Sequence, residues 1–293
     1  MATRTASPPP ASAPAQAPQP PCGESGHRAD IEGLRATAVL LVLAYHAGIP
    51  LFAGGFVGVD VFFVISGFLI TGLIVREVQQ TGRLSLARFY ARRARRLLPA
   101  TAVVLTAVAV LTVVILPPIR RSSVAMDLAA SSLYAINWRL AGEAVDYMAS
   151  EQAASPVQHF WSLAVEEQFY LVWPVLILAL VWWHRRSGWS LRRTLLAGLA
   201  VLAIPSLVWS VTLTHSVPGR AYLVSTTRAW ELGIGAAVAV GATGLARLPR
   251  RVRWLGGWVG AGAIVVAALT YDSSTLFPGY AALLPTLGAA LVI

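Results

Sequence analysis

Long apolar runs separated by short polar segments dominate the chain after residue 28. A membrane-spanning helix needs about 20 mostly apolar residues, and eight runs approach that length. They are Leu34–Ile49, Phe56–Val75, Ala100–Leu116, Ser162–Trp183, Thr194–Thr214, Leu223–Ala242, Trp254–Tyr271 and Phe277–Ile293. The pattern therefore predicts an all-α fold, a polytopic bundle of transmembrane helices.

A ninth apolar stretch, Val124–Leu140, is interrupted by charged and amide side chains. Three arginine clusters help to place it; they lie at Arg76–Arg96, Arg185–Arg193 and Arg247–Arg253. Arginine-rich loops favour the cytoplasmic side of a membrane, so the chain should cross an even number of times between the first two clusters. We therefore expect the ninth stretch to lie at the outer interface or to re-enter, although Arg120, Arg121 and Arg139 would then lie outside.

Composition supports the membrane class. The chain is 56% hydrophobic and only 12% charged, with a mean hydropathy of +0.65, whereas soluble domains carry about 25% charged residues. The net charge of +10 comes from arginines that flank apolar runs, so we predict no nucleic-acid binding. A single cysteine excludes an intrachain disulfide, and the histidines form no HExxH pair, so we predict no metal site. Residues 1–28 are rich in Pro and Ala and predict a disordered cytosolic tail.

Ionisable residues inside apolar runs are costly and tend to be functional. Arg35 and His46 are eleven positions apart, which places them about 20° apart around a helix and about 16 Å apart along it. Glu32 falls on the same stripe, and Asp60 begins the next run. We expect Asp60 to orient the His46 ring, as carboxylates do for catalytic histidines. The alternative interpretation is a packing histidine and a helix-capping aspartate.

Two further segments carry candidate chemistry. The amphipathic segment RFYARRARRLLP, residues 88–99, would either anchor the chain on anionic lipid or hold the phosphates of a cytosolic donor. Glu166 and Glu167 are adjacent carboxylates inside a span, with His159 and Ser162 on the side of Glu166. In a later span, Arg228 lies three residues before a glutamate and is expected to neutralise it.

Four ordered motifs give the chain a family resemblance. They are IEGLRATAVLLVLAYHAG at 31–48, GGFVGVDVFFVISGFLIT at 54–71, RFYARRARRLLPA at 88–100 and HFWSLAVEEQFYLVWPV at 159–175. The chain resembles the acyltransferase-3 family of integral membrane O-acyltransferases, and TRAWELGIGA at 227–236 is similar to a later family segment. The resemblance implies about ten membrane helices. We therefore expect a transmembrane acyltransferase domain over residues 29–293 that is truncated at its C-terminus.

The resemblance implies that an acyl group, acetyl most of all, passes from cytosolic acyl-CoA to a hydroxyl of a sugar-containing acceptor. It implies a multi-pass protein of the bacterial cytoplasmic membrane with a cytoplasmic N-terminus, and no metal. The family pattern Arg-x10-His corresponds to Arg35 and His46. The residues implied in donor binding are Arg35, Arg92, Arg93 and Arg96, and those implied in catalysis are His46, Asp60, Glu166 and Glu167; Ser162 and Gln168 complete the last motif.

Several alternatives remain open at this point. His46 could act as a general base or carry the acyl group itself, and either Glu166 or Asp60 could polarise it. A proton-coupled transporter could use the same histidine and glutamates as a relay, although no internal repeat is visible. A non-catalytic membrane scaffold would use every motif for packing.

Overall fold

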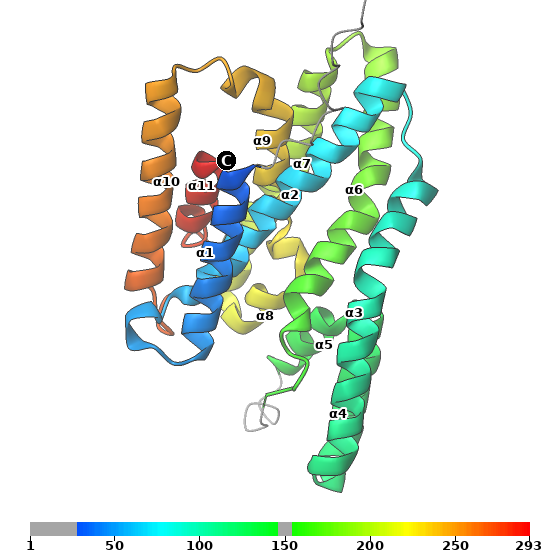
Figure 1. Ribbon diagram of the computed structural model, residues 1–293, viewed down its shortest axis with the longest axis vertical. Helices are drawn as coiled ribbons and strands as arrows, with labels where there is room; N and C mark the ends of the chain where they lie inside the picture. Colours follow the sequence, from blue (N-terminus) through cyan, green and yellow to red (C-terminus); the bar gives the residue numbers. More distant parts are fainter. Residues whose placement is uncertain (1–27, 146–153) are drawn as a thin grey trace, which may run out of the picture.

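The structure, a computed structural model, describes residues 28–145 and 154–293, and within these ranges it consists of helices and short connections without a β-strand (Figure 1). The prediction of an all-α helical bundle is confirmed. The predicted tail, residues 1–28, lies almost wholly outside the described residues. The helices are α1 Ala29–His46, α2 Gly58–Thr81, α3 Leu86–Ile115, α4 Pro118–Ser132, α5 Ile136–Glu143, α6 Phe160–Ser187, α7 Leu191–Ser216, α8 Pro218–Leu223, α9 Ala229–Leu245, α10 Arg250–Thr270 and α11 Leu283–Val292, with short 3₁₀ turns η1 Pro50–Phe52, η2 Gly55–Val57 and η4 Ser225–Thr227.

Five helices of the described chain are long and apolar enough to cross a membrane: α2 with η2, α3, α6, α7 and α10. Helices α9 and α11 are apolar but shorter. Two predicted spans begin too early in the sequence. The run Leu223–Ala242 is helical as α9 only from Ala229, because α8 and η4 precede it, and the run Phe277–Ile293 is helical only from Leu283.

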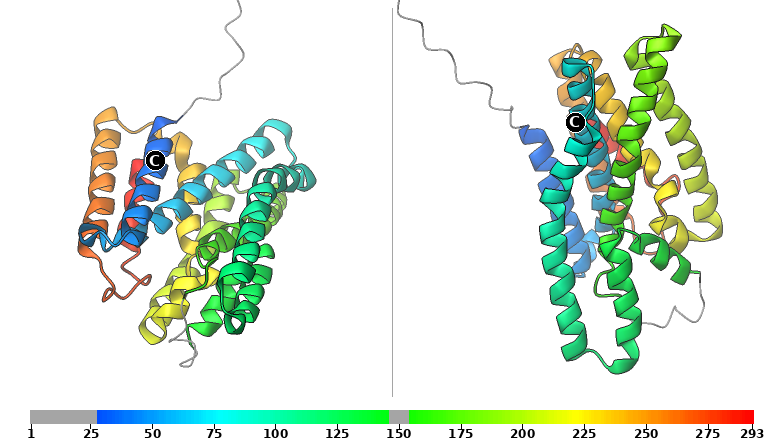
Figure 2. Two further views of the ribbon diagram at one scale, coloured as in Figure 1. Left: turned by 60° about the horizontal axis from the view of Figure 1, so that its bottom comes forward. Right: turned by 90° about the vertical axis from the view of Figure 1, so that its right-hand side faces the viewer.

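The ninth apolar stretch forms two short helices, not a span. Helix α4 returns alongside the lower part of α3 (Figure 1), and the chain breaks at Leu133–Ala135 before α5. Tyr134 in this break has a φ of 51°, in the left-handed region that interrupts a helix. The stretch therefore does not form one helix of span length; its place at the outer interface or as a re-entrant segment stays a prediction. Figure 2 shows the α3–α4 hairpin at one edge of the bundle and α10 at the opposite edge.

Helices α2 and α9 approach so closely that their backbones touch. A Cβ atom added to Gly67 of α2 would lie 1.9 Å from the carbonyl oxygen of Leu232, and one added to Gly235 of α9 would lie 1.9 Å from that of Val64. Small residues permit such close crossings between membrane helices. The contact fixes the first half of α2, which carries Asp60, against the start of α9.

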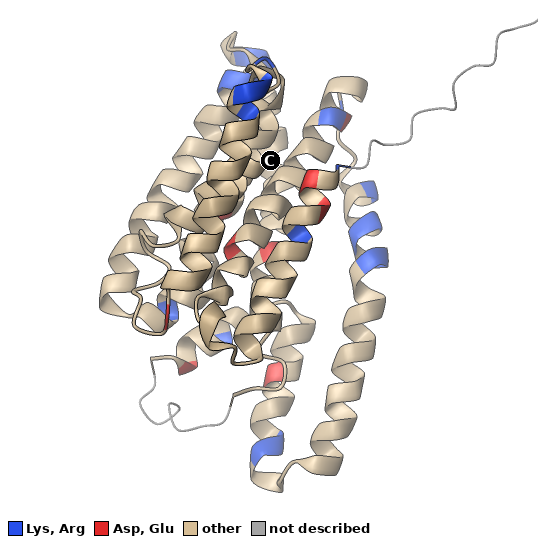
Figure 3. Ribbon diagram, turned by 60° about the vertical axis from the view of Figure 1, so that its left-hand side comes forward, with Lys and Arg blue, Asp and Glu red and all other residues tan. Residues whose placement is uncertain are grey.

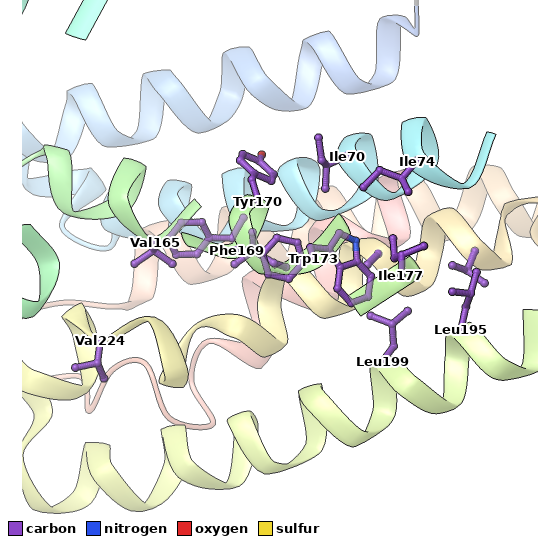
Figure 4. Packing of buried hydrophobic residues seen from close by; sticks show 14 of the residues in the cluster. Ile70, Ile74, Val165, Phe169, Tyr170, Trp173, Ile177, Leu195, Leu199 and Val224 are labelled. Carbon is purple, nitrogen blue, oxygen red and sulfur yellow. The ribbon is translucent and has the colours of Figure 1, made fainter. Parts of the chain in front are cut away.

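Helix α6 is packed through large apolar side chains. Trp173 lies between α2 and α7, beside Ile70 and Leu199 (Figure 4), and its indole nitrogen donates a 2.7 Å hydrogen bond to the hydroxyl of Thr71 on α2. The ring is 1% exposed, so its N–H needs a partner inside the protein. This packing holds the first half of α6, Phe160 to Trp173, against α2.

Candidate active site

Consecutive residues of α6 contact different neighbours. Each residue of an α-helix is rotated by about 100° from the one before it, so adjacent carboxylates point to different helices. Glu166 accepts a hydrogen bond from the hydroxyl of Ser66 on α2. Glu167 pairs with Arg93 on α3, with 2.7 Å between a carboxylate oxygen and Nη2. The two predicted carboxylates therefore bind partners on helices remote in sequence.

Gln168, the next residue of α6, is the centre of a polar network. Its amide nitrogen donates to the carbonyl oxygen of Tyr134 at 2.7 Å and to the side-chain oxygen of Asn137 at 2.9 Å. Its amide oxygen accepts from the indole of Trp138 at 2.9 Å and from the hydroxyl of Ser225 at 2.5 Å. These bonds use both donors and both acceptor sites of the amide. Gln168 therefore joins α6 to α5 and η4.

Arg93 lies at the polar end of a cavity between α3 and α6. Its guanidinium carbon is 3.5 Å from the ring centre of Tyr170, and its Nε is buried without a hydrogen-bond partner among the described residues. The cavity, called here the α3–α6 cavity, has a volume of about 360 Å³. It is lined by Tyr90, Arg93, Ala94, Leu97, Leu98, Leu133, Tyr134, Glu167, Gln168, Tyr170 and Leu171. The lining thus combines charged and aromatic side chains with four leucines.

The other arginines expected at the donor site are spread over two helices. Arg92 lies 3.3 Å from a carboxylate oxygen of Glu77 on α2, and Arg96 is exposed on α3. Arg35 is half-buried on α1, with Nη1 3.7 Å from a carboxylate oxygen of Glu32. The four predicted residues therefore do not form one cluster. Figure 3 shows most of the blue ribbon, which marks arginine because the chain has no lysine, toward one end of the bundle, with further blue segments toward the other end.

A larger cavity lies where α1 ends and α6 begins, away from the arginine-rich end. We call it the outer cavity because it lies away from the arginine-rich end of the bundle; its volume is about 670 Å³. It is lined by Val42, Tyr45, His46, Phe56, Val59, Ser155, Gln158, His159, Trp161, Ser162, Pro218, Gly219, Tyr222, Asp272, Ser273, Thr275 and Phe277. Aromatic rings and hydroxyl groups thus share its wall with two imidazoles. It has no lining residue in common with the α3–α6 cavity.

His46 lines the outer cavity from the last turn of α1. Its Nδ1 is 2.8 Å from the carbonyl oxygen of Val42. A carbonyl oxygen only accepts hydrogen bonds, so this contact assigns the proton to Nδ1 and leaves the lone pair on Nε2. The ring of Tyr45 meets His46 edge-on, with 5.2 Å between ring centres. The imidazole is thus held in the tautomer that can accept a proton or attack a carbonyl carbon through Nε2.

Asp60 does not orient His46 as expected from the sequence. Its carboxylate lies 3.0 Å from Nη1 of Arg228, and the same nitrogen lies 2.6 Å from the carboxylate of Glu231. All three side chains are fully buried. The expected pairing of Arg228 with Glu231 is therefore confirmed, but the ring of His46 is held by a main-chain carbonyl because Asp60 points toward α9.

The buried Asp60–Arg228–Glu231 cluster lies directly behind aromatic residues of the outer cavity. The guanidinium carbon of Arg228 is 5.0 Å from the ring centre of Tyr222, and it lies 5.3 to 5.7 Å from the ring centres of Trp161, Phe277 and Phe63. Tyr222, Trp161 and Phe277 also line the outer cavity. The cluster thus supports one wall of the cavity from within the bundle.

His159 is the residue of this site that the sequence reasoning left without a role. It immediately precedes α6, with helical φ and ψ angles of −58° and −17°, and it lines the outer cavity together with His46 and Ser162. Its position seven residues before Glu166 was visible in the sequence. The sequence did not show that His159 shares a cavity with His46, because this depends on how α1 and α6 pack.

Comparisons with known proteins show which family the chain belongs to. The family described as an acyltransferase domain matches residues 28–293. The chain is similar to the peptidoglycan O-acetyltransferase OatA of Listeria monocytogenes, with 39% identity over 211 residues, 71% of this chain and 33% of that protein. It is also similar to the O-acetyltransferase OatA of Staphylococcus aureus, with 36% identity over 210 residues, 71% of this chain and 34% of that protein. No solved structure matches the chain.

The chain spans about a third of the length of the curated relatives that it matches. Within the chain, by contrast, the family match extends over nearly all residues, from the start of α1 to the end of α11. All four motifs quoted above lie inside the matched region. The chain therefore belongs to the acyltransferase-3 family of membrane proteins.

Proposed function

We propose that this chain is the membrane-embedded part of an O-acyltransferase that moves an acyl group from cytosolic acyl-CoA to a hydroxyl of a sugar-containing acceptor. Acetyl-CoA is the proposed donor. Family membership supports acyl transfer, and two relatives are named O-acetyltransferases, one of them for peptidoglycan. The proposed acceptor class rests on the name of the peptidoglycan O-acetyltransferase and on the aromatic wall of the outer cavity.

The observation that carries the proposal is the hydrogen bond from Nδ1 of His46 to Val42. It leaves the Nε2 lone pair available in a cavity with room for a sugar ring. As a general base, His46 takes the proton of the acceptor hydroxyl while that oxygen attacks the thioester carbonyl. The new C–O bond forms, the C–S bond breaks, and the leaving thiolate takes the proton from His46.

A second sequence of steps uses the same lone pair. Nε2 attacks the thioester first, the thiolate leaves, and His46 carries the acyl group until the acceptor oxygen displaces it. The hydroxyl proton then passes to the freed imidazole and from there to the thiolate or solvent. Both sequences require Nε2 to face the acceptor, and both are lost when the ring is removed.

The arginine-rich end of the bundle is proposed to face the cytosol, together with the N-terminus. Arg92 and Arg96 are exposed there and would bind the phosphates of CoA. Arg93 on α3 and Arg35 on α1 are half-buried and would hold a part of the donor that enters the bundle. Glu166 and Glu167 act as the carboxylate partners of this region, and Asp60 supports the wall of the outer cavity through Arg228.

The test is His46→Ala in cells that express the full protein, with base-labile O-acetyl groups on envelope glycans as the readout. His215→Ala is the matched control, because His215 is an exposed histidine on α7 that lies beside Tyr280 and outside both cavities. We expect acetylation to fall to background in His46→Ala and to persist in His215→Ala. Retained acetylation in His46→Ala would refute the proposal.

A donor-binding measurement separates this function from proton-coupled transport. A protein that binds a ligand only in its folded form is stabilised by it. We expect acetyl-CoA, but not acetate, to raise the unfolding temperature of the purified protein in detergent. Equal effects of the two compounds would contradict the assignment of acetyl-CoA as donor.

A further inference from the structure

The outer cavity holds two imidazoles that come from different helices. His46 ends α1 and His159 immediately precedes α6, 113 positions later in the sequence, and both line the same cavity. A positive charge on His46 lowers the pKa of His159. The mechanism proposed above uses only one of these rings, so the second is a titratable group of the site without a role.

We propose that His159 is a second functional imidazole, which binds a further hydroxyl of the acceptor while His46 acts on the hydroxyl that receives the acyl group. This inference rests on the proposed acyl transfer. Sugars carry hydroxyl groups on adjacent carbons, so a second neutral ring can hold one hydroxyl while the first acts on its neighbour. A neutral imidazole both donates and accepts hydrogen bonds, whereas a protonated one only donates.

The surroundings of His159 favour the neutral form. Partial burial of the ring and the nearby charge of His46 lower the pKa of His159, so the ring remains unprotonated to a lower pH than a free histidine. A ring kept neutral in this way retains its acceptor nitrogen at neutral pH, even when His46 carries a proton.

Among the residues that the structure describes, the other titratable groups that line the outer cavity are two tyrosines and one aspartate. Tyr45 of α1 and Tyr222 of α8 line the same cavity. Asp272 also lines it, but its Oδ1 accepts hydrogen bonds from Ser274, at 2.9 Å from the main-chain nitrogen and 2.6 Å from the hydroxyl. Behind the aromatic wall, Arg228 is already paired with two carboxylates.

The first experiment measures the coupling without requiring an acceptor. Diethyl pyrocarbonate modifies unprotonated imidazoles, and mass spectrometry of the detergent-solubilised protein follows His159 as a function of pH. In His46→Gln the opposing charge is absent, so the pH at which His159 becomes protonated is expected to rise. In His215→Gln it is expected to stay at the wild-type value. An unchanged titration in His46→Gln would overturn the pairing.

The second experiment tests the role in transfer, with soluble peptidoglycan fragments as the acceptor probe and acetyl-CoA as donor. A lost hydrogen bond to substrate corresponds to about a tenfold effect. We expect His159→Phe to raise the KM for the fragments about tenfold while leaving the KM for acetyl-CoA unchanged, and His159→Gln to recover part of the loss. Equal changes in both KM values, or none, would overturn the role of His159.

The two proposals fail in different ways. Transfer that survives His46→Ala refutes the proposed function, whatever His159 does. Transfer that is lost in His46→Ala but unaffected by His159→Phe refutes only this inference. The modification experiment decides on the pairing even if the fragments are not acetylated by the wild-type protein.

Discussion

The contact between α2 and α9 gives a prediction whose size follows from the coordinates. In Gly67→Ala the new Cβ would lie 1.9 Å from the carbonyl oxygen of Leu232. An ordinary contact needs about 3.5 Å, so the helices would have to separate by about 1.5 Å. The obstructing atom belongs to the main chain and cannot rotate away. We therefore expect the free energy of unfolding to fall by about 3 kcal/mol, which is the upper end of the usual cost of overpacking.

Gly72→Ala is the matched control on the same helix. Nothing lies within 4 Å of a Cβ at Gly72, so the substitution has only its effect on helix propensity. Replacing glycine by alanine inside a helix stabilises it by about 0.5–1 kcal/mol. The same substitution at two positions five residues apart is thus expected to lower stability at Gly67 and to raise it at Gly72. The free energies of unfolding of the two variants should differ by nearly 4 kcal/mol.

The assay is reversible unfolding in mixed micelles with increasing SDS, followed by tryptophan fluorescence. Gly235→Ala should reproduce Gly67→Ala, because its Cβ would also lie 1.9 Å from a main-chain oxygen across the same contact. The double variant should lose less stability than the two single variants added together, since one separation of the helices accommodates both methyl groups. Equal stability of Gly67→Ala and Gly72→Ala would refute the close contact.

Three further predictions concern the buried polar groups. Arg228→Met leaves two buried carboxylates unpaired and should destabilise the fold by about 3–5 kcal/mol, measured in the same micelle assay; wild-type stability would contradict the described cluster. Gln168→Leu leaves four hydrogen-bonding groups without their partner. We expect the free energy of unfolding to fall by at least about 2 kcal/mol and the backbone amides of α5 to exchange hydrogen faster. Arg93→Lys keeps the charge but loses the planar contact with Tyr170. It should lower the affinity for acetyl-CoA severalfold, measured by thermal stabilisation, and an unchanged affinity would exclude Arg93 from donor binding.

Much of the helical architecture could be predicted because a bilayer requires long apolar segments. The errors occur where an apolar run does not continue as a helix. Between Leu223 and Ala229 the chain forms η4, in which the hydroxyl of Thr227 donates to the carbonyl oxygens of Ala221 and Val224. Such side-chain bonds compete with helix formation, and mean hydropathy over a window does not detect them.

The sequence could predict how the site residues are spaced along each helix, but not which residues of different helices contact one another. The spacing of Arg35 and His46 follows from the helix repeat. The partner of Asp60 does not follow from any local pattern, because Arg228 lies 168 positions later in the sequence. The rotation of α2 about its axis decides which residue Asp60 meets. Because Asp60 lies near His46 in the sequence, we predicted that its carboxylate would contact the His46 ring. The rotation of α2 directs it to Arg228 instead.

Glu166 and Glu167 show how two adjacent carboxylates can both have partners inside one span. Ser66 of α2 donates a hydrogen bond to Glu166, and Glu167 pairs with Arg93 of α3. Arg35 of α1 has its own carboxylate neighbour, because Glu32 of the same helix lies 3.7 Å away. A polar or charged group without a partner is costly inside a membrane. Because neighbouring residues of a helix differ by about 100° in direction, each of the two carboxylates of α6 meets its partner on a different helix.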